Sequence, residues 1–357
     1  MRVCILGSGL TALTLAKALV NQNIFVDLIS SNKNHKINHS RTIGISKSNF
    51  NYFNRNITNI EKISWKLKKI EIYTDKNKNE KILNFENSDE QLFSIIKNQQ
   101  LYEVLNKNLF KNKYFKKIKP KKKLVKQEKY NLIVNTEYNN YFTKKYFNKK
   151  IEKKYNSVAY TTILEHERIS NNVAVQIFTK NGPLAFLPIS DYETSIVYSI
   201  NNHLKGEKEV NNLINTYNSK YTLKKINKIN SFELHGLSLR SYFHKNILAF
   251  GDLLHRIHPL AGQGFNMTIR DIKILNDIIQ KKIDLGLPLD LTLNTEFENN
   301  QKHKNYIFSK GIDLIHEFFN FERKTKNDFL SNSIKYFNKN QSINKIFTKI
   351  ADKGFLF

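Results

Sequence analysis

The chain has a single cysteine, Cys4, and no long uncharged apolar run. One cysteine excludes an intramolecular disulfide and a cysteine-based metal site, and it fits a reducing compartment. No window approaches the ~18 uncharged apolar residues of a membrane span. The apolar core of a signal peptide is also missing from the first residues, where Gly7 and Gly9 interrupt the apolar sequence. The sequence therefore predicts a cytoplasmic location, either soluble or peripheral at the inner face of a membrane.

Acidic residues are scarce, because 31 Asp+Glu stand against 58 Lys+Arg and the net charge is +27. Such an excess attracts polyanions, and its densest runs lie at residues 111–129 and 144–154. No nucleic-acid-binding module accompanies these runs, so nucleic acid is not an expected partner. A weak attraction to anionic lipid is compatible with them. The alternative interpretation is compositional, since the chain is rich in the Lys, Asn, Ile, Phe and Tyr that AT-rich coding sequence favours.

The N-terminal segment has the order of a βαβ unit. Residues 3–6 (VCIL) and 24–29 (IFVDLI) predict strands, and apolar residues at 12, 15, 16 and 19 predict one face of a helix between them. The first strand and the helix are joined by a G-x-G-x-x-A dinucleotide-binding turn that begins at Gly7. Gly7 allows the tight turn, Gly9 lets the backbone approach a pyrophosphate, and Ala12 leaves room for the helix to pack on the strand.

A second motif occupies residues 246–271. The run NILAF (246–250) predicts a buried strand, and GDLLHRIHPLAGQGFNMTIRD (251–271) follows it. The strand leads through a loop to a helix N-terminus, where backbone N–H groups favour an anion or a polar ring. His255 and His258 have the i, i+3 spacing of a metal pair. No cysteine or carboxylate cluster joins them, so they are expected to hold the loop and no metal site is predicted.

The residue order of this second motif resembles the second flavin fingerprint of class A flavoprotein monooxygenases, which have the p-hydroxybenzoate-hydroxylase-like fold. Within that class it is most similar to the polyprenylphenol hydroxylases of ubiquinone biosynthesis, whose version reads close to GDAAHxxHPLAGQGxNxGxRD. The resemblance implies an α/β fold with a Rossmann-like FAD-binding domain, a second domain built on an antiparallel sheet, and a C-terminal helical tail. It is densest at residues 1–20, 179–189 and 246–275.

The resemblance implies that both motifs hold FAD. Asp252 is expected to accept hydrogen bonds from the ribityl chain, and Pro259 to stiffen the loop beneath the isoalloxazine ring. Arg41 opens the segment RTIGIS, which resembles the family's R-A-x-A-L-S, and is expected beside the flavin and its phosphates. N–H groups of residues 264–266 are expected to stabilise reduced flavin, with the Asn266 side chain adding a bond. The predicted cofactor-binding residues are Gly7, Gly9, Ala12, Arg41, Asp252, Pro259, Gly262, Gln263, Gly264, Phe265 and Asn266.

Three positions depart from the family pattern. Ser30 and Ser31 follow the second strand, where an acidic residue usually binds the adenosine ribose, while Asp27 lies inside the strand. A neutral hydroxyl binds more weakly than a carboxylate, so a loosely held flavin is expected. Gln99 replaces an arginine, which removes a positive charge near the flavin. Glu137-Tyr138 replaces an Asp-Gly pair, and a tyrosine cannot take the glycine's place if the turn needs a positive φ, which puts use of NAD(P)H in doubt.

Residues 158–200 are rich in β-formers and predict the sheet of the second domain. The segment TKNGPLAFLPI (179–189) resembles the family's TxxGPLAFLPL, and Asn181-Gly182 predicts a hairpin turn within it. In the family this sheet covers the flavin ring. Phe186, Leu187 and Pro188 are therefore candidates for the apolar wall around an aromatic substrate, with packing in the domain core as the alternative.

Helices are predicted at residues 95–110, from 264 to about 282, and within 301–357. In the last region, residues 312, 314, 315, 318 and 319 form an early apolar face, and 346, 347, 350 and 355 a late one. At 357 residues the chain is long enough for about two domains. The expected FAD-binding domain comprises 1–62, 94–155 and 234–290, the substrate domain 63–93 and 156–233, and the C-terminal helices 291–357.

By resemblance, the expected function is FAD-dependent hydroxylation of the aromatic ring of a polyprenylated phenol in ubiquinone biosynthesis. NAD(P)H is the expected electron donor, and O2 would form a flavin C4a-hydroperoxide that attacks the ring. A general base would help, but the sequence singles out no catalytic residue. Proteins of quinone synthesis and a membrane surface are expected partners. Two alternatives stay open: a related flavoprotein that hydroxylates another aromatic compound or reduces an isoprenoid, and a flavin-poor scaffold of a quinone-synthesis complex.

Overall fold

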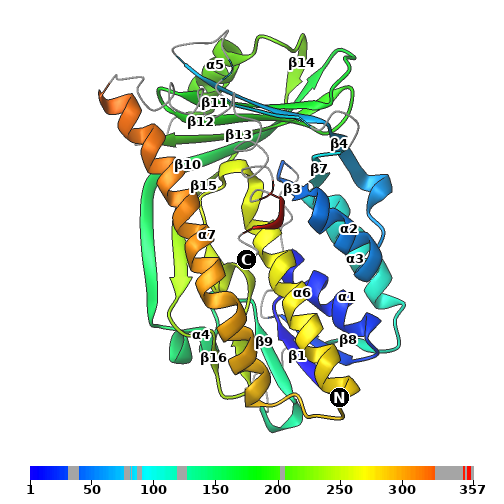
Figure 1. Ribbon diagram of the computed structural model, residues 1–357. Helices are drawn as coiled ribbons and strands as arrows, with labels where there is room; N and C mark the ends of the chain where they lie inside the picture. The colour runs from blue at the N-terminus through cyan, green and yellow to red at the C-terminus, as the bar shows by residue number, and fades with distance from the viewer. Residues whose placement is uncertain are drawn as a thin grey trace.

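The computed structural model describes residues 1–30, 40–75, 81, 83–86, 91–118, 127–201, 206–325, 349 and 352–354. Within this part of the chain the strands form three sheets, which we name the parallel sheet, the large sheet and the small sheet. Figure 1 shows the large sheet at one end of the molecule, with long helices running from it along the parallel sheet. Ser31 and the predicted late apolar face at Ile346, Phe347, Ile350 and Phe355 lie outside the described residues.

The N-terminal motif forms the centre of the parallel sheet. Its strands, in spatial order, are β16 (Phe243–His244), β17 (Ile247–Ala249), β9 (Leu132–Asn135), β1 (Arg2–Leu6), β2 (Phe25–Ile29) and β8 (Phe115–Ile118). Strand β9 pairs in parallel with β1 on one side and with β17 on the other. Because parallel strands end at the same edge, the two glycine motifs leave this sheet side by side, with only β9 between their strands.

Helices cover this sheet. The residues predicted for the first helical face are buried in α1 (Leu10–Asn21). In α6 (Gln263–Asp284) the buried apolar residues include Ile269, Ile272, Leu275, Ile278 and Ile279. Helix α3 (Asn98–Phe110) starts later than the predicted residue 95. Ile95 and Ile96 belong instead to β7 (Phe93–Lys97), because β-branched side chains favour a strand that has neighbours on both sides. The short helix α4 (Tyr141–Tyr146) follows β9.

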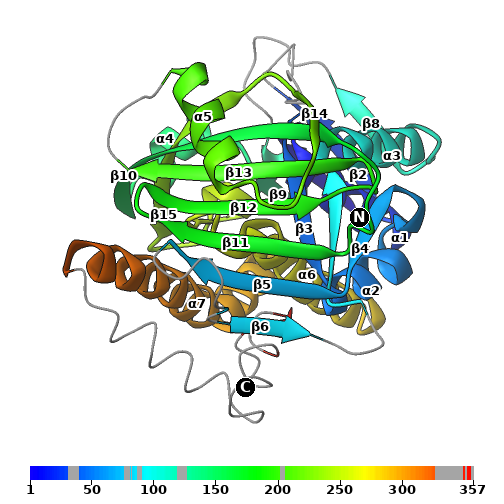
Figure 2. The same ribbon diagram turned by 90° about the horizontal axis from the view of Figure 1, so that it is seen from above.

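The large sheet is mostly antiparallel, and Figure 2 shows its strands running side by side beneath α5 (Glu207–Tyr217). Its strands, in spatial order, are β18 (His255–Arg256), β15 (Asn230–Leu239), β10 (Lys150–His166), β13 (Glu193–Asn201), β12 (Gly182–Pro188), β11 (Val173–Thr179), β5 (Lys69–Thr74) and β6 (Leu83–Glu86), with β14 (Leu223–Ile226) beside β10. The predicted hairpin is present, but its two-residue turn is Lys180-Asn181 rather than Asn181-Gly182. Gly182 is the first residue of β12, where a β-carbon would lie 1.9 Å from the Ser199 carbonyl oxygen.

The small sheet lies between the other two sheets and carries the segment that follows Arg41. It consists of β3 (Thr42–Ser46), β7 and β4 (Ser64–Leu67), and α2 (Lys47–Asn56) continues directly from β3. A β-carbon at Gly44 would lie 2.4 Å from a ring carbon of Phe93 on the neighbouring strand. Glycine at this position therefore lets Phe93 lie across the small sheet.

The C-terminal helix α7 (Leu291–Thr325) begins ten residues before the predicted region and extends up to the large sheet (Figure 1). Its predicted apolar face is partly wrong. Ile312 and Phe319 are buried, but Leu314 and Ile315 are 64% and 42% exposed. The buried face of α7 contains His316 between Ile312 and Phe319 instead. The predicted fold class, an α/β chain with a Rossmann-like part, an antiparallel-sheet part and a C-terminal helix, is confirmed. No helix of the described residues is both long and apolar enough to span a bilayer.

Candidate flavin site

The two glycine motifs meet at the edge of the parallel sheet. Helix α1 begins after Gly9 without a side-chain cap, so the N–H groups of its first turn stay available. Gly251 has a φ of +65°, and a β-carbon there would lie 2.5 Å from Thr11 Cγ2 in that turn. Asp252 follows it and is exposed. A carboxylate and an uncapped helix N-terminus thus lie beside each other at this edge.

Gly7 makes the tight turn after β1. It has a φ of +135°, and a β-carbon there would lie 2.1 Å from Thr136 Oγ1. The Thr136 hydroxyl donates a hydrogen bond of 2.8 Å to the Leu6 carbonyl oxygen. Backbone conformation and crowding by the turn after β9 both require glycine here.

The second motif begins α6 in a similar way. Gly262 has a φ of +63° and precedes the helix without a side-chain cap. The short helix Leu260–Gly262 connects it to Pro259. A β-carbon at Gly264 would meet none of the described residues within 4 Å, so there is room for another molecule beside this residue. This N-terminus is the second one available for an anion or a polar ring.

The Asn266 side chain joins α6 to the small sheet rather than reaching toward a ligand. Its Oδ1 accepts 2.9 Å bonds from the Ser46 N–H and from Asn49 Nδ2, and its Nδ2 donates to the carbonyl oxygens of Gly44 and Gly262. These four bonds use the hydrogen-bonding capacity of the amide. The expected side-chain bond from Asn266 to the flavin is therefore wrong, and its backbone N–H stays the predicted contact.

Arg41 lies between these elements and the large sheet. Its guanidinium carbon is 4.6 Å from the centroid of the Phe232 ring on β15, which is cation–π distance, although part of the side chain stays exposed. Desolvation by its neighbours lowers the pKa of Arg41, while the negative charge of Asp252 raises it. The two predicted cofactor-binding residues, far apart in sequence, are thus within electrostatic reach of each other.

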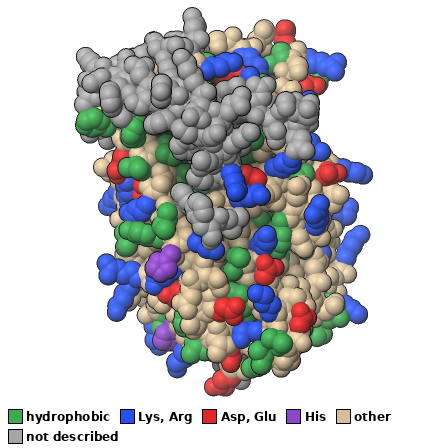
Figure 3. All heavy atoms as spheres, viewed as in Figure 1, with side chains coloured by type: hydrophobic (Ala, Val, Ile, Leu, Met, Phe, Trp, Pro, Cys, Tyr) green, Lys and Arg blue, Asp and Glu red, His purple; other side chains and the backbone are tan. Residues whose placement is uncertain are grey.

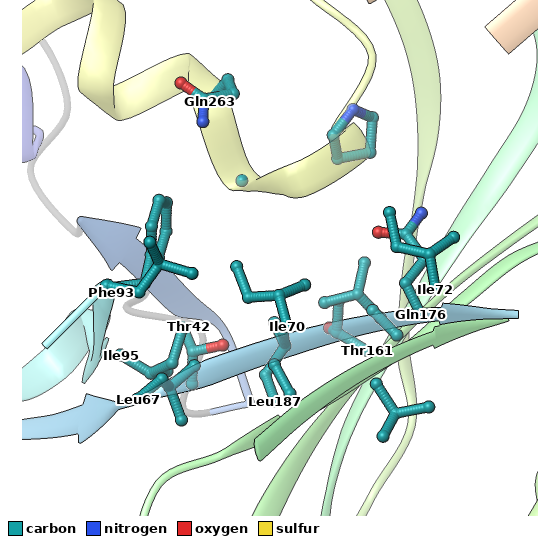
Figure 4. Close-up of a pocket in the computed structure, with 18 of the residues that line it drawn as sticks. Thr42, Leu67, Ile70, Ile72, Phe93, Ile95, Thr161, Gln176, Leu187 and Gln263 are labelled. Carbon is teal, nitrogen blue, oxygen red and sulfur yellow. The ribbon is translucent and has the colours of Figure 1, made fainter. Parts of the chain in front are cut away.

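An apolar cavity of about 200 Å³ opens between the large sheet, the small sheet and the loop before α6 (Figure 4). Figure 4 shows Gln263 on one side, with Ile70, Thr161 and Leu187 on the sheet opposite. Predicted residues that line the cavity are Arg41, Pro259, Gly262, Gln263 and Leu187. Residues that the sequence did not single out also line it: Leu67, Ile70, Ile72, Phe93, Ile95, Thr161, Gln176, Ala185, Val197 and Phe232.

The residues predicted for a substrate wall, 186–188, lie on both faces of β12. Leu187 lines the cavity, whereas Phe186 is buried in the core on the opposite face of the sheet, with residues of α5. Successive side chains of a strand point to opposite faces of the sheet, so Leu187 and its neighbour Phe186 lie on different sides. The same alternation in Ile70-Glu71-Ile72 could have identified the cavity face of β5.

The departures from the family pattern have structural explanations. Ser30 donates a 3.0 Å hydrogen bond to Ser8 Oγ, and Asp27 is buried and accepts a 2.9 Å bond from the Tyr130 hydroxyl. Tyr138 does not adopt a positive φ, so the predicted conflict with the turn does not arise. Its ring instead faces Arg256, whose guanidinium carbon is 5.4 Å from the ring centroid.

The two histidines of the loop have different surroundings. Buried His255 Nε2 lies 2.5 Å from Asp271 Oδ2. His258 is buried, and within the described part of the chain neither of its ring nitrogens has a hydrogen-bond partner. The centroid of its ring lies 4.2 Å from that of His316 and 5.1 Å from that of Tyr155. The described residues contain no group of three His, Cys, Asp or Glu that could hold a metal ion.

These features fit FAD. Two uncapped helix N-termini lie near Asp252 and Arg41, and the second of them borders the apolar cavity. The first suits a diphosphate and the second the polar edge of a ring whose body lies in the cavity. Residues near Gly7, Gly9 and Asp252 would hold the nucleotide end, and Pro259 to Asn266 the ring.

Comparison with known proteins confirms the class. A model of the FAD-binding domain family matches residues 192–283. The structure is similar to p-nitrophenol 4-monooxygenase of Pseudomonas putida, with a TM-score of 0.79 and 11% identity over 97% of this chain and 96% of that one. It is also similar to Klebsiella pneumoniae HpxO complexed with FAD and uric acid, with a TM-score of 0.77 and 11% identity over 99% and 97%. The chain is thus similar over part of its length to an FAD-binding domain family, and it shares its fold with FAD-dependent monooxygenases.

Two curated proteins of ubiquinone biosynthesis are similar in sequence to part of the chain. The ubiquinone biosynthesis monooxygenase COQ6 of Xenopus tropicalis is 26% identical over 209 residues, which cover 46% of this chain and 45% of that protein. The 3-demethoxyubiquinol 3-hydroxylase of Escherichia coli K12 is 27% identical over 152 residues, which cover 40% of this chain and 39% of that protein. The chain thus spans less than half the length of the curated relatives it matches.

Proposed function

We propose that the chain is an FAD-dependent monooxygenase that hydroxylates the aromatic ring of a polyprenylated phenol in ubiquinone biosynthesis. The observation that carries this proposal is the cavity between the large sheet and the first turn of α6. Its lining is mostly aliphatic and aromatic, with Arg41, Gln176 and Gln263 among the few polar side chains. Such a site suits an apolar ring with a small polar group. The named activities of the two ubiquinone-biosynthesis relatives support this substrate class.

The chain's own residues have defined tasks in this reaction. FAD supplies the redox and oxygen chemistry when it is bound. Ile70, Ile72 and Leu187 exclude water from the cavity and hold a ring against the loop before α6. The uncapped N-terminus of α6 stabilises negative charge that develops next to it. NAD(P)H is the proposed electron donor and O2 the second substrate.

A flavin-poor scaffold of a quinone-synthesis complex is the second candidate. The observation that favours it is the missing acidic residue after β2, where Ser30 bonds to Ser8 instead. A scaffold would need the fold and its surface but not turnover. We also propose contact with quinone-synthesis proteins or an anionic membrane, which the net charge of +27 and exposed apolar residues of α7 such as Leu314 and Phe321 support.

A turnover assay separates these candidates. The FAD-loaded protein is supplied with NADH or NADPH, O2 and either a short-chain polyprenylphenol or a soluble phenol, and the hydroxylated product is measured by mass spectrometry. Preferential hydroxylation of the prenylated phenol would support the proposal. Preferential hydroxylation of the soluble phenol would show that the substrate is a soluble phenol instead of a polyprenylated one. In cells that depend on this protein for quinone, restored synthesis by an Asp252→Ala variant without flavin would favour the scaffold.

A further inference from the structure

A second cavity, of about 330 Å³, lies between α2, α6 and α7, apart from the predicted flavin residues. Four basic side chains line it, and we name it the basic cavity: Arg270 and Lys273 from α6, Lys304 from α7, and Lys353 near the C-terminus. We propose that the basic cavity binds a phosphate-type anion, either a free phosphate or diphosphate or the phosphate of a lipid headgroup. This proposal does not depend on the proposed hydroxylase activity.

Positive charge is in excess along the lining of the basic cavity, although Asp271 and Asp352 lie within electrostatic reach of Arg270, and Asp277 within reach of Lys273. No aspartate or glutamate is among the described residues that line it. Arg270 and Lys304 are half-buried, while Lys273 and Lys353 are exposed at its rim. Like charges that converge from separate elements repel one another, and the repulsion grows where water is partly excluded. A bound anion would remove this repulsion, and an anion with two or more charges would do so best.

Arg270 has an unused donor. Its Nη1 is buried and has no hydrogen-bond partner among the residues that the structure describes. The nearest acids are committed elsewhere: Asp271 accepts bonds from His255, Gln301 and Asn305, and an Asp352 oxygen accepts the Ser48 N–H at 2.8 Å. A buried donor without a partner is costly, so it indicates that an acceptor is missing.

The Arg270 guanidinium is held in place before any ligand binds. Its central carbon lies 4.7 Å from the centroid of the Phe308 ring. Gly354 lies close to it, because a β-carbon there would be 3.1 Å from Arg270 Nε. These two contacts fix the orientation of the planar guanidinium, whose N–H groups match the spacing of phosphate oxygens. Because the side chain is already ordered, less conformational entropy is lost when an anion binds.

A polar donor completes the lining. The Tyr52 hydroxyl accepts a 3.2 Å bond from Asn276 Nδ2. Burial raises the pKa of Tyr52 to about 12, so the hydroxyl keeps its proton at neutral pH. It can therefore donate to an anion oxygen, as the lysines and Arg270 can.

The test uses FAD-saturated protein, so that added phosphate does not compete for the dinucleotide site. Binding of inorganic phosphate and of diphosphate is measured by isothermal titration at constant ionic strength, and binding to phosphatidylglycerol vesicles by sedimentation against phosphatidylcholine vesicles. The double variant Lys273→Gln/Lys304→Gln removes two cavity charges. Lys281→Gln/Lys310→Gln removes two charges from the same helices outside the cavity. This control is needed because basic side chains are spread over this face of the protein (Figure 3).

The proposal predicts saturable binding of at least one probe, weakened about tenfold or more in the cavity variant and little changed in the control. Binding of phosphate or diphosphate identifies a free anion as the ligand, and binding of the vesicles alone identifies a headgroup. An Arg270→Lys variant, which keeps the charge and removes the fork, should also bind more weakly. Saturable binding of none of the probes, or equal weakening in the two double variants, would overturn the proposal.

Discussion

Ser30 is predicted to limit how firmly the adenosine end of FAD is held. Its hydroxyl bonds to Ser8, just after β2, where dinucleotide-binding folds usually carry an acid. We expect Ser30→Glu to tighten FAD binding about tenfold, because a charge-assisted bond to a ribose hydroxyl exceeds a neutral one by ~1–2 kcal/mol. Quenching of flavin fluorescence on titration measures the dissociation constant. Ser30→Gln is the matched neutral control, and equal affinities of the Glu and Gln variants would contradict the explanation.

Asn266 is predicted to matter for stability rather than for flavin contact through its side chain. Asn266→Ala leaves the Ser46 N–H and the Gly44 carbonyl oxygen without these partners in a buried position. We expect a loss of about 3 kcal/mol in the free energy of unfolding, measured by urea denaturation. Asn300→Ala, on α7, removes a bond from an exposed amide and should cost far less. Similar losses in both variants would show that the buried network is not stabilising.

At the residue scale, the sequence predicted which segments carry the site better than what each side chain does. Gly7 and Gly262 have the positive φ that their turns require, and such positions are recognisable from glycine itself. The role of Asn266 depends on atoms of β3, which is distant in sequence. The hydrogen-bond partners of a buried side chain such as Asn266 follow only from the three-dimensional structure.

The packing of α7 on the loop before α6 predicts a pH dependence of stability. His258 of the loop faces Tyr155, Lys153, Asp313 and His316, and burial together with the charges of His316 and Lys153 lowers its pKa from 6.5 to about 3. As the pH falls from about 6.5 toward 3, His258 therefore becomes protonated in the unfolded chain but stays neutral in the folded chain. Stability contributed by neutral His258 is present above this window and lost within it.

We expect this group to account for about 2 kcal/mol of lost unfolding free energy between pH 7 and pH 5. His258→Gln cannot titrate, so its stability should fall correspondingly less over the same range, whatever its absolute value at pH 7. Urea denaturation of both proteins at the two pH values provides the comparison. Parallel losses in the two proteins would show that His258 does not stay neutral in the fold.

At the element scale, periodicity predicted α1 and α6 well because each buries a continuous apolar stripe. It failed where tertiary contacts overrode the pattern. Ile95 and Ile96 fit a helix face but pair with strands on both sides, and Leu314 and Ile315 are exposed because α7 buries His316 instead. Neither choice is visible in the local sequence.

The cavity between the sheets is a property of the whole molecule, since its walls come from segments as far apart in sequence as Arg41, Phe232 and Asp352. We expect Ala185→Phe to fill part of it. Product formation should fall at least tenfold, because a ring can no longer reach the loop before α6, while bound flavin stays unchanged. Steady-state kinetics together with the visible spectrum test this. Unchanged turnover would place the substrate elsewhere.

At this scale the sequence predicted the fold class through two short motifs, and the comparisons confirm the same class. It could not predict the cavity lining or the basic cavity. The first forms where the large and small sheets meet the loop before α6, and the second where α2, α6 and α7 meet, so both depend on long-range packing rather than on any one segment.

The most direct test of the account is whether the protein holds flavin through these motifs. The protein is purified in excess FAD, free flavin is removed, and the visible spectrum is recorded for the natural chain and for Asp252→Ala. We predict flavin bands near ~450 nm in the natural chain and their loss or strong reduction in the variant, with unchanged circular dichroism. A folded natural chain without bound flavin, or a variant that retains as much flavin, would contradict the central claim.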